Sequence, residues 1–149
     1  MKPYFETIER QEQLRRVAGL WRGTPFVPHA RIRGAGVDCV HLAAEIYREC
    51  GHLAQFQPGN YAMDGGFHNP LSQVLTWLDL SPYFSAGTLP ARTGDLLCFR
   101  IGQSVHHVGV ALSARHFLHV MRGSTVTLAR TDDPAWSKRL TAVYQPIES

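Results

Sequence analysis

Apolar residues recur every three or four positions in three segments of the first half of the chain, which is the spacing of amphipathic helices. The first helix has Trp21 on its apolar stripe and is expected to stop at Gly19 or Gly23, the second is expected to be capped by Asp38, and the third by Asn69. Between the second and third, clustered glycines with a proline predict a loop over residues 53–68. The predicted helices cover residues 7–18, 38–51 and 70–80.

The second half of the chain has a different pattern, in which short runs rich in β-branched and aromatic residues are separated by glycines. These runs predict five strands joined as an antiparallel meander, at residues 96–101, 105–112, 117–122, 125–130 and 142–147. Helices followed by strands predict an α+β fold, with the N-terminal helices packed on a central antiparallel sheet of about five strands.

The composition agrees with one domain over residues 1–149, since 44% of the residues are hydrophobic and 18% are charged. We expect no membrane span and no signal peptide, because the first thirty residues carry many charges and no apolar run approaches about 20 residues. We therefore expect synthesis in the cytoplasm. A net charge of +3 without a lysine-rich run does not favour a nucleic-acid partner.

Cys39 is the first candidate for chemistry, because it follows the glycine-rich loop at Gly34 and Gly36 and falls in the first turn of the predicted second helix. The unpaired N–H groups of a helix N-terminus favour a thiolate over a thiol, and the thiolate is the nucleophilic form. The chain's three cysteines form no CxxC pair, which argues against a disulfide framework.

His107 and His119 are the candidate partners of this thiol. If two strands form a hairpin around Ser113, each histidine lies six residues from its centre, so the imidazoles face each other on one side of the sheet. With the Cys39 helix packed on that face, His107 takes the thiol proton and His119 orients His107. His106 is the neighbouring alternative, since alternation sends it to the opposite face.

Four motifs in order resemble the NlpC-type cell-wall cysteine peptidases, a bacterial and phage branch of the papain-like superfamily. They are Gly36-Val37-Asp38-Cys39-Val40-His41-Leu42, Gly94-Asp95-Leu96, His107-Val108-Gly109-Val110 and Phe117-Leu118-His119-Val120. Trp21-Arg22-Gly23-Thr24-Pro25-Phe26 and the loop from Arg33 to Gly36 look most like phage-tail and gene-transfer-particle members.

The resemblance implies a papain-like NlpC-type fold and cleavage of an amide bond in the peptidoglycan stem peptide, without a cofactor or metal. It also implies phage-tail-like or secretion-particle partners and action at the cell wall after delivery by such a particle. The candidate substrate-binding residues are Asp38, Phe26, His41 and Arg33, the last of which could meet carboxylates of a wall peptide.

Two positions depart from the family pattern and keep other functions open. Phe26 stands where a tyrosine is common, and His41 stands where a small residue is usual. These departures favour the alternative of a catalytically weak or inactive particle domain that binds the wall or serves assembly. An acyltransferase would use the same nucleophile, and a zinc site built from Cys39, His107 and His119 is a further alternative.

Overall fold

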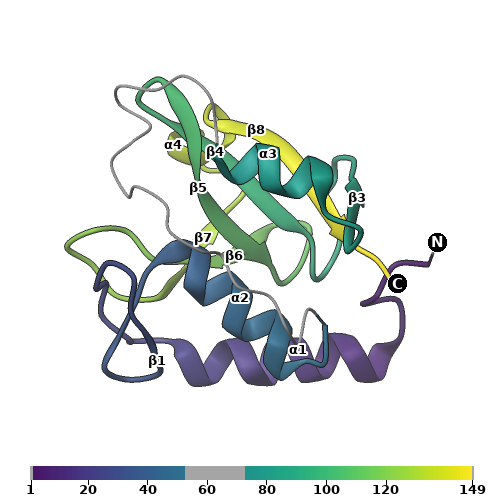
Figure 1. The fold of residues 1–149 in the computed structure, drawn as a ribbon, viewed down its shortest axis with the longest axis horizontal. Helices are drawn as coiled ribbons and strands as arrows, with labels where there is room; N and C mark the ends of the chain where they lie inside the picture. Colours follow the sequence, from purple (N-terminus) through teal and green to yellow (C-terminus); the bar gives the residue numbers. More distant parts are fainter. Residues whose placement is uncertain (1, 53–72, 149) are drawn as a thin grey trace.

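The computed structural model describes residues 2–52 and 73–148, with helices and strands in the order expected of an α+β fold (Figure 1). The helices are α1 (Ile8–Trp21), α2 (Cys39–Glu49), α3 (Gln73–Leu80) and α4 (Pro134–Ser137). The strands are β1 (Arg31–Ile32), β2 (Gly36–Val37), β3 (Phe84–Ala86), β4 (Leu96–Ile101), β5 (Ser104–Ala111), β6 (His116–His119), β7 (Thr127–Arg130) and β8 (Leu140–Pro146).

The first helix is longer than its predicted range. The side chain of Thr7 caps it by accepting from the N–H of Arg10, and the helix continues through Gly19 to Trp21. A glycine costs a helix only about 1 kcal/mol relative to alanine. Trp21, the last residue of the predicted apolar stripe, is almost fully buried, which outweighs that cost.

The second helix lies where the sequence predicts it. Asp38 is its N-cap, and its apolar side buries Leu42 and Ile46. The third helix ends at Leu80 as expected, but its predicted cap at Asn69 and the predicted loop over 53–68 lie outside the described residues.

The main sheet has six antiparallel strands in the order β3-β8-β4-β5-β6-β7. All five predicted strands are present, with ends shifted by up to three residues, and β3 is an additional edge strand. The meander expectation is wrong for β8, which returns to pair with β4. Four consecutive residues of β4, from Leu96 to Phe99, are buried, and such a continuous apolar run suits a strand with neighbours on both sides.

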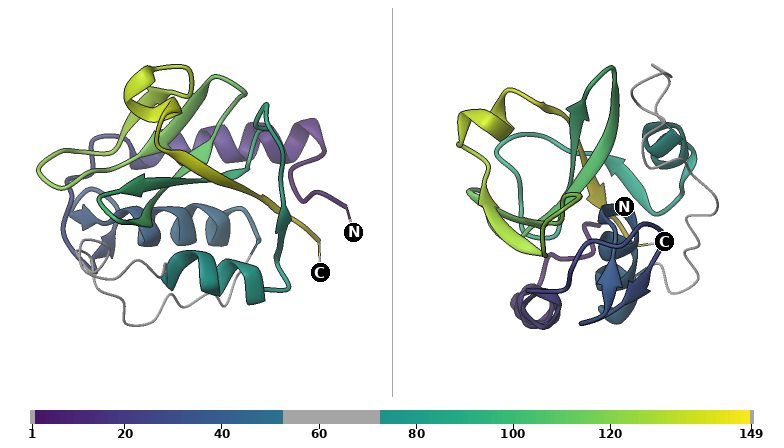
Figure 2. Two further views of the ribbon diagram at one scale, coloured as in Figure 1. Left: turned by 90° about the horizontal axis from the view of Figure 1, so that it is seen from above. Right: turned by 90° about the vertical axis from the view of Figure 1, so that its left-hand side faces the viewer.

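The sheet separates two apolar clusters. On one side α1 and α2 pack against it (Figure 2), and this cluster includes Cys39, Cys98, Val108 and Val110. On the other side a smaller cluster contains Phe99 and Phe117 and is covered by Trp136 of α4. None of the described helices is both long and apolar enough to cross a membrane.

Candidate active site

Cys39 is held at the start of α2 by the loop that precedes it. Val37 forms a short ladder with Arg31 and a parallel bridge with Phe26, and the N–H of Val37 donates to the carbonyl of Pro25. Gly36 allows the close approach of this loop, because a Cβ there would lie 2.6 Å from a methyl carbon of Val27. The glycine loop therefore fixes the backbone immediately before the thiol.

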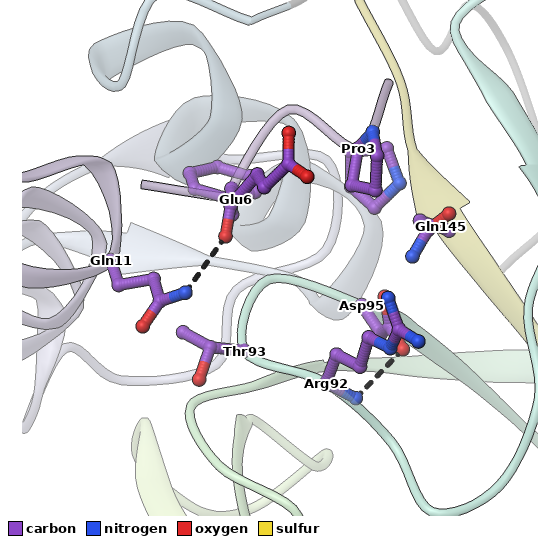
Figure 3. A pocket seen from close by; sticks show the side chains of 9 residues that line it. Pro3, Glu6, Gln11, Arg92, Thr93, Asp95 and Gln145 are labelled. Atoms are coloured by element: carbon purple, nitrogen blue, oxygen red, sulfur yellow. Dashed lines mark hydrogen bonds between the residues drawn. The ribbon is translucent and has the colours of Figure 1, made fainter. Parts of the chain in front are cut away.

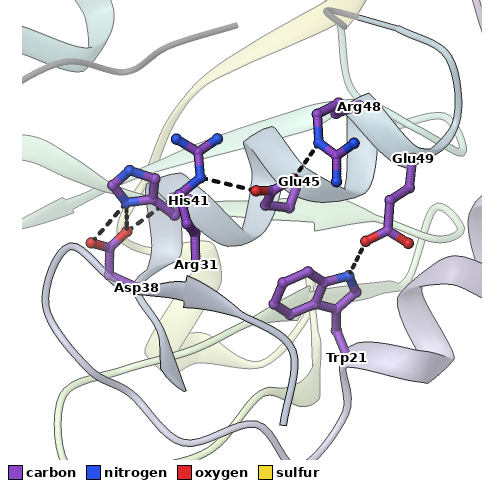
Figure 4. A network of polar contacts seen from close by, with 7 residues as sticks. All are labelled: Trp21, Arg31, Asp38, His41, Glu45, Arg48 and Glu49. Carbon is purple, nitrogen blue, oxygen red and sulfur yellow. Dashed lines mark hydrogen bonds and ion pairs between the residues drawn. The ribbon is translucent and has the colours of Figure 1, made fainter. Parts of the chain in front are cut away.

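Asp38 is fully buried and binds several protein donors, among them the His41 side chain (Figure 4). Its Oδ1 accepts from the backbone N–H of His41 at 2.9 Å, and its Oδ2 accepts from the N–H of His29 at 2.6 Å. The Nδ1 atom of His41 lies 3.0 Å and 3.1 Å from the two carboxylate oxygens. These contacts assign Asp38 and His41 to fixing the helix start. Their predicted part in substrate binding stays a prediction.

The sulfur of Cys39 lies against the backbone of β5. Its Sγ is 3.9 Å from the carbonyl oxygen of His106, which the thiol approaches as a donor. Burial raises the pKa of the Cys39 thiol to about 12, although the N–H groups of Val108, Val40 and Cys39 oppose that shift. The expected effect of the helix start is therefore present but smaller than the cost of desolvating a thiolate.

The contact of Cys39 with β5 falls where β5 and β6 have separated. Both backbone groups of Ala111 bond to Gly94 and Asp95 on the β4 side, so alternation turns the backbone groups of Val108 toward the β6 side. His106 is the extra residue at the register shift between β4 and β5. The β5–β6 ladder itself covers only Val110 and Ala111. Cys39 thus contacts β5 beyond the stretch in which β5 pairs with β6.

His107 and His119 are in contact, with 3.0 Å between Nε2 of His107 and Nδ1 of His119. They are not directly opposite as expected, because Val110 pairs with Leu118 and this register places them as diagonal neighbours. The hairpin is centred on Ala114, one residue beyond the expected centre, since Ser113 Oγ accepts N–H bonds that extend the turn. A one-residue change of centre shifts the register by two, which keeps both imidazoles on one face.

The imidazoles lie on the opposite face from that expected for them. His107 contacts the rings of Phe99 and Trp136, at centroid distances of 5.8 Å and 5.4 Å, whereas Val108 faces the helices. Burial lowers the pKa of His107 to about 3 and that of His119 to about 4. The sulfur lies beside the β5 backbone, and the imidazoles project from the face of the sheet that α4 covers. No hydrogen bond joins the thiol to an imidazole in the described part of the chain.

Phe26 and Arg33, the other two candidate substrate-binding residues, occupy different places. Phe26 is half-buried next to Val37, with the guanidinium carbon of Arg122 5.5 Å from its ring centroid. Arg33 Nη1 donates to Glu49 Oε2 at 3.2 Å. Glu49 is the last residue of α2, and a rise of 1.5 Å per residue places it about 15 Å along the helix axis from Cys39. Phe26 therefore lies close to the start of α2, whereas Arg33 is directed away from it.

Trp136 is the functional candidate that sequence reasoning missed. Its ring lies 4.7 Å from that of His119, although it comes from a four-residue helix far from any motif. The only local signal is Asp133-Pro134, an N-cap followed by a proline, which marks a helix start without indicating what the helix covers. No group of three or more His, Cys, Asp or Glu side chains in the described residues is arranged to hold a metal ion.

Asp95 belongs to a separate pocket of about 210 Å³ beside the N-terminal segment (Figure 3). Its Oδ2 accepts from the N–H of Arg92 at 2.9 Å, a contact that fixes the loop before β4. Burial raises the pKa of this carboxyl to about 6.

Known proteins resemble both the sequence and the fold. A protein of Escherichia coli (strain K12), described as murein DD-endopeptidase MepS/murein LD-carboxypeptidase, is 40% identical over 122 residues, which cover 80% of this chain and 54% of that protein. The chain thus spans about half the length of this relative.

Two solved structures show the same fold. One is an NLP/P60 family protein, described as similar to lipoprotein, from Staphylococcus aureus subsp. aureus Mu50; it has a TM-score of 0.64 at 19% identity and covers 100% of this chain and 45% of its own. The other is the NlpC/p60 domain of the peptidoglycan hydrolase SagA, with a TM-score of 0.58 at 16% identity over 93% of this chain and 98% of that domain. These likenesses confirm the predicted α+β fold.

The model of the NlpC/P60 family matches residues 23–145. This one match contains the glycine loop, the start of α2 and both histidine-bearing strands. The chain belongs to the NlpC/P60 family.

Proposed function

We propose that the chain is a cysteine hydrolase that cleaves an amide bond in the stem peptide of peptidoglycan. The observation that carries this proposal is the contact of Cys39 with β5 at His106, directly beside His107, whose imidazole bonds to that of His119. In the proposal, Cys39 is the nucleophile, His107 the general base and His119 the residue that positions His107.

The imidazole contact supports one assignment of protons. A hydrogen on Nε2 of His107, donated to Nδ1 of His119, leaves Nδ1 of His107 unprotonated and able to accept the thiol proton. His119 then fixes both the tautomer and the ring orientation of the base. The lowered pKa values of both imidazoles keep them neutral near pH 7, so Nδ1 of His107 has a lone pair available, but a pKa of about 3 makes this imidazole a weak base in the resting structure.

The proposed reaction has two steps, formation of a thioester and its hydrolysis. A bond forms between Sγ and the amide carbonyl carbon, the thiol proton passes to His107, and the backbone N–H of Cys39 donates to the oxyanion. Collapse breaks the C–N bond, His107 returns the proton to the leaving amine, and a thioester remains. Water then attacks the thioester with His107 as base, releasing a carboxylic acid and the thiol.

The resting protonation states bear on the first of these steps. With the thiol pKa raised to about 12 and the imidazole pKa lowered to about 3, the pair rests as a neutral thiol and a neutral imidazole. Proton transfer then accompanies the attack on the carbonyl, and it requires the thiol to leave the His106 carbonyl and Nδ1 of His107 to come within hydrogen-bond reach of the sulfur at the strand edge.

The proposed substrate and setting come from the relatives. The E. coli relative is described as a murein endopeptidase and carboxypeptidase, which supports a wall peptide as substrate and the cell wall as the place of action. Delivery by a phage-tail-like or secretion particle remains part of the proposal, and its support is the resemblance of residues 21–26 and 33–36.

Digestion of purified peptidoglycan, with mass analysis of the released fragments, tests the chemistry. Cys39→Ala and His107→Ala should each lower product formation by about 1,000-fold or more, and His119→Gln by about 10- to 100-fold. Cys50→Ala is the matched control, because Cys50 is also a buried cysteine at an end of α2 and should keep near wild-type activity. An unchanged product profile for Cys39→Ala would exclude this mechanism.

The orientation of the thiol favours a second candidate function, a catalytically inactive domain that binds the wall. The thiol donates to a carbonyl, and its pKa is raised rather than lowered. Such a domain would sediment with purified peptidoglycan and release no fragments from it, and Cys39→Ala would bind as well as the wild type. Fragment release that requires Cys39 would exclude this alternative.

A further inference from the structure

Three cationic side chains line one pocket on the outer side of α4. The pocket has a volume of about 460 Å³ and lies where α4, the end of β4 and the start of β8 meet. It is lined by Arg100, Gly102, Pro134, Ala135, Lys138, Arg139 and Thr141.

The positive charge of this pocket is not neutralised within the described part of the chain. Arg100, Lys138 and Arg139 take part in none of the ion pairs there, whereas five other arginines bond to carboxylates. The nearest acidic residue along α4, Asp133, accepts from the N–H of Ala135 as the helix cap. Three exposed cations around one concave surface favour a ligand with more than one negative charge.

Two of the cations are held in place by backbone contacts. Arg100 Nη1 donates to the carbonyl of Gln103 at 2.9 Å, and Arg139 Nε donates to the carbonyl of Ala135 at 3.1 Å. A backbone bond of 2.8 Å from the N–H of Arg100 to the carbonyl of Arg139 also ties the two segments together. Each guanidinium keeps further N–H donors for a ligand, at a reduced cost of ordering its side chain.

The same short helix faces the imidazoles with its other side. Trp136 of α4 contacts the rings of His107 and His119, while Ala135 and Lys138 line the cationic pocket. We propose that Arg100, Lys138 and Arg139 form an anion-binding site for the carboxylate or phosphate groups of a multiply charged ligand. This inference goes beyond the proposed hydrolysis, because binding at this site does not require Cys39.

Binding of polyglutamate and of polyphosphate to the full Cys39→Ala chain tests the proposal and separates the two ligand chemistries. Isothermal titration calorimetry at low salt should show that at least one of them binds, with an affinity that falls as salt is added. Replacing Arg100, Lys138 and Arg139 together by glutamine should weaken that binding by at least about tenfold. The single change Lys138→Gln, which leaves the hydrogen bonds of both guanidinium groups in place, should weaken it by about threefold.

The control replaces Lys2, Arg16 and Arg22 by glutamine, since these three exposed residues lose the same total charge elsewhere on the surface. Binding by the control within twofold of the parent supports the site. Equal loss in both triple variants, no loss in either, or no binding of either polyanion would overturn it. Because every variant lacks Cys39, none of these outcomes depends on the proposed hydrolysis.

Discussion

The thiol of Cys39 is surrounded by groups that shift its pKa in opposite directions. Burial disfavours the thiolate most strongly, the carboxylate of Asp38 adds to that effect, and three backbone N–H groups oppose it. A sequence motif shows the helix start, whose N–H groups lower the pKa of the thiol. It does not show how completely the folded protein removes water from the sulfur, and this loss of water has the stronger effect on the pKa here.

Alkylation of Cys39 by iodoacetamide should therefore be slow at neutral pH. With a pKa of about 12, the thiolate fraction rises roughly tenfold per pH unit up to pH 10, and the rate should rise with it and show no plateau. Mass spectrometry of a variant in which Cys50 and Cys98 are replaced by alanine follows this one thiol. A plateau near pH 8.5 would show an ordinary exposed thiol, and a plateau below pH 7 a stabilised thiolate.

Asp95 should make stability depend on pH in the opposite direction from an ion-paired carboxylate. Its pKa is raised from 3.8 to about 6 by burial, so the native state favours the protonated form. The unfavourable contribution is absent below pH 3.8, grows between pH 3.8 and pH 6, and levels off above pH 6 at roughly 3 kcal/mol, at about 1.4 kcal/mol per pKa unit.

Urea unfolding of Asp95→Asn beside the wild type checks this contribution. The asparagine keeps an acceptor for the N–H of Arg92 and carries no charge, so it should gain stability relative to the wild type between pH 4 and pH 8. A difference in free energy of unfolding that does not change over this range would show that the native carboxyl is well hydrated.

At the scale of elements, the caps of α1 and α2 differ in burial although both come from short polar side chains. Thr7 caps α1 at an exposed position with one bond of 3.3 Å, whereas Asp38 is fully buried and receives bonds from two backbone N–H groups and an imidazole. Asp38→Ala should therefore cost about 2–4 kcal/mol, because buried donors lose their acceptor. Thr7→Ala should cost only about 0.5–1 kcal/mol.

Chemical denaturation of these two variants provides the comparison, with circular dichroism confirming that each is folded in buffer. Equal losses of stability would contradict the role assigned to Asp38 in fixing the helix start. A loss below about 1 kcal/mol for Asp38→Ala would mean that water replaces the carboxylate in that site.

Trp136 of α4 should control the pKa of the two imidazoles. Its ring lies against both, and burial is the largest cause of their lowered pKa values. Trp136→Ala admits water, so both pKa values should rise toward about 6.5. NMR titration of the imidazole Hε1 resonances measures this shift, and Trp77→Phe serves as a control. Unchanged pKa values in Trp136→Ala would show that other groups exclude the water.

The elements were predictable to the extent that their signals are local. The apolar stripe and the capping residue Asp38 predict α2, and runs of β-branched residues predict five of the strands. The register of His107 and His119 was not predictable, because it depends on how Ser113 bonds within the turn. Their shared face was predictable, since a shift of two residues preserves it.

Contacts between segments that are distant in the sequence were less predictable than the elements themselves. Packing of the whole helix decides which face of the sheet α2 covers. The alternation of strand residues does not predict this, because side chains point to both faces. The pairing of β8 with β4, and the cover that α4 gives to the imidazoles, join segments whose sequences carry no sign of each other. The sequence therefore predicts the candidate residues better than their relative positions.

At the scale of the whole molecule, the two apolar clusters share one sheet. Trp21 lies in the helix-side cluster, Trp136 packs against the other, and the central strands contribute side chains to both. Neither cluster can lose its packing without exposing one face of the same strands. We therefore expect residues 1–149 to unfold as a single cooperative unit, as predicted for one domain.

Single-tryptophan variants test this cooperativity, because the chain has only Trp21, Trp77 and Trp136. One variant keeps Trp21 and the other keeps Trp136, with phenylalanine at the remaining two positions. In each variant the urea transition followed by fluorescence should coincide with that followed by far-ultraviolet circular dichroism. If the Trp136 signal changes at a lower urea concentration than the helical signal, the cover over the imidazoles opens separately from the core, and access to His107 becomes a local equilibrium.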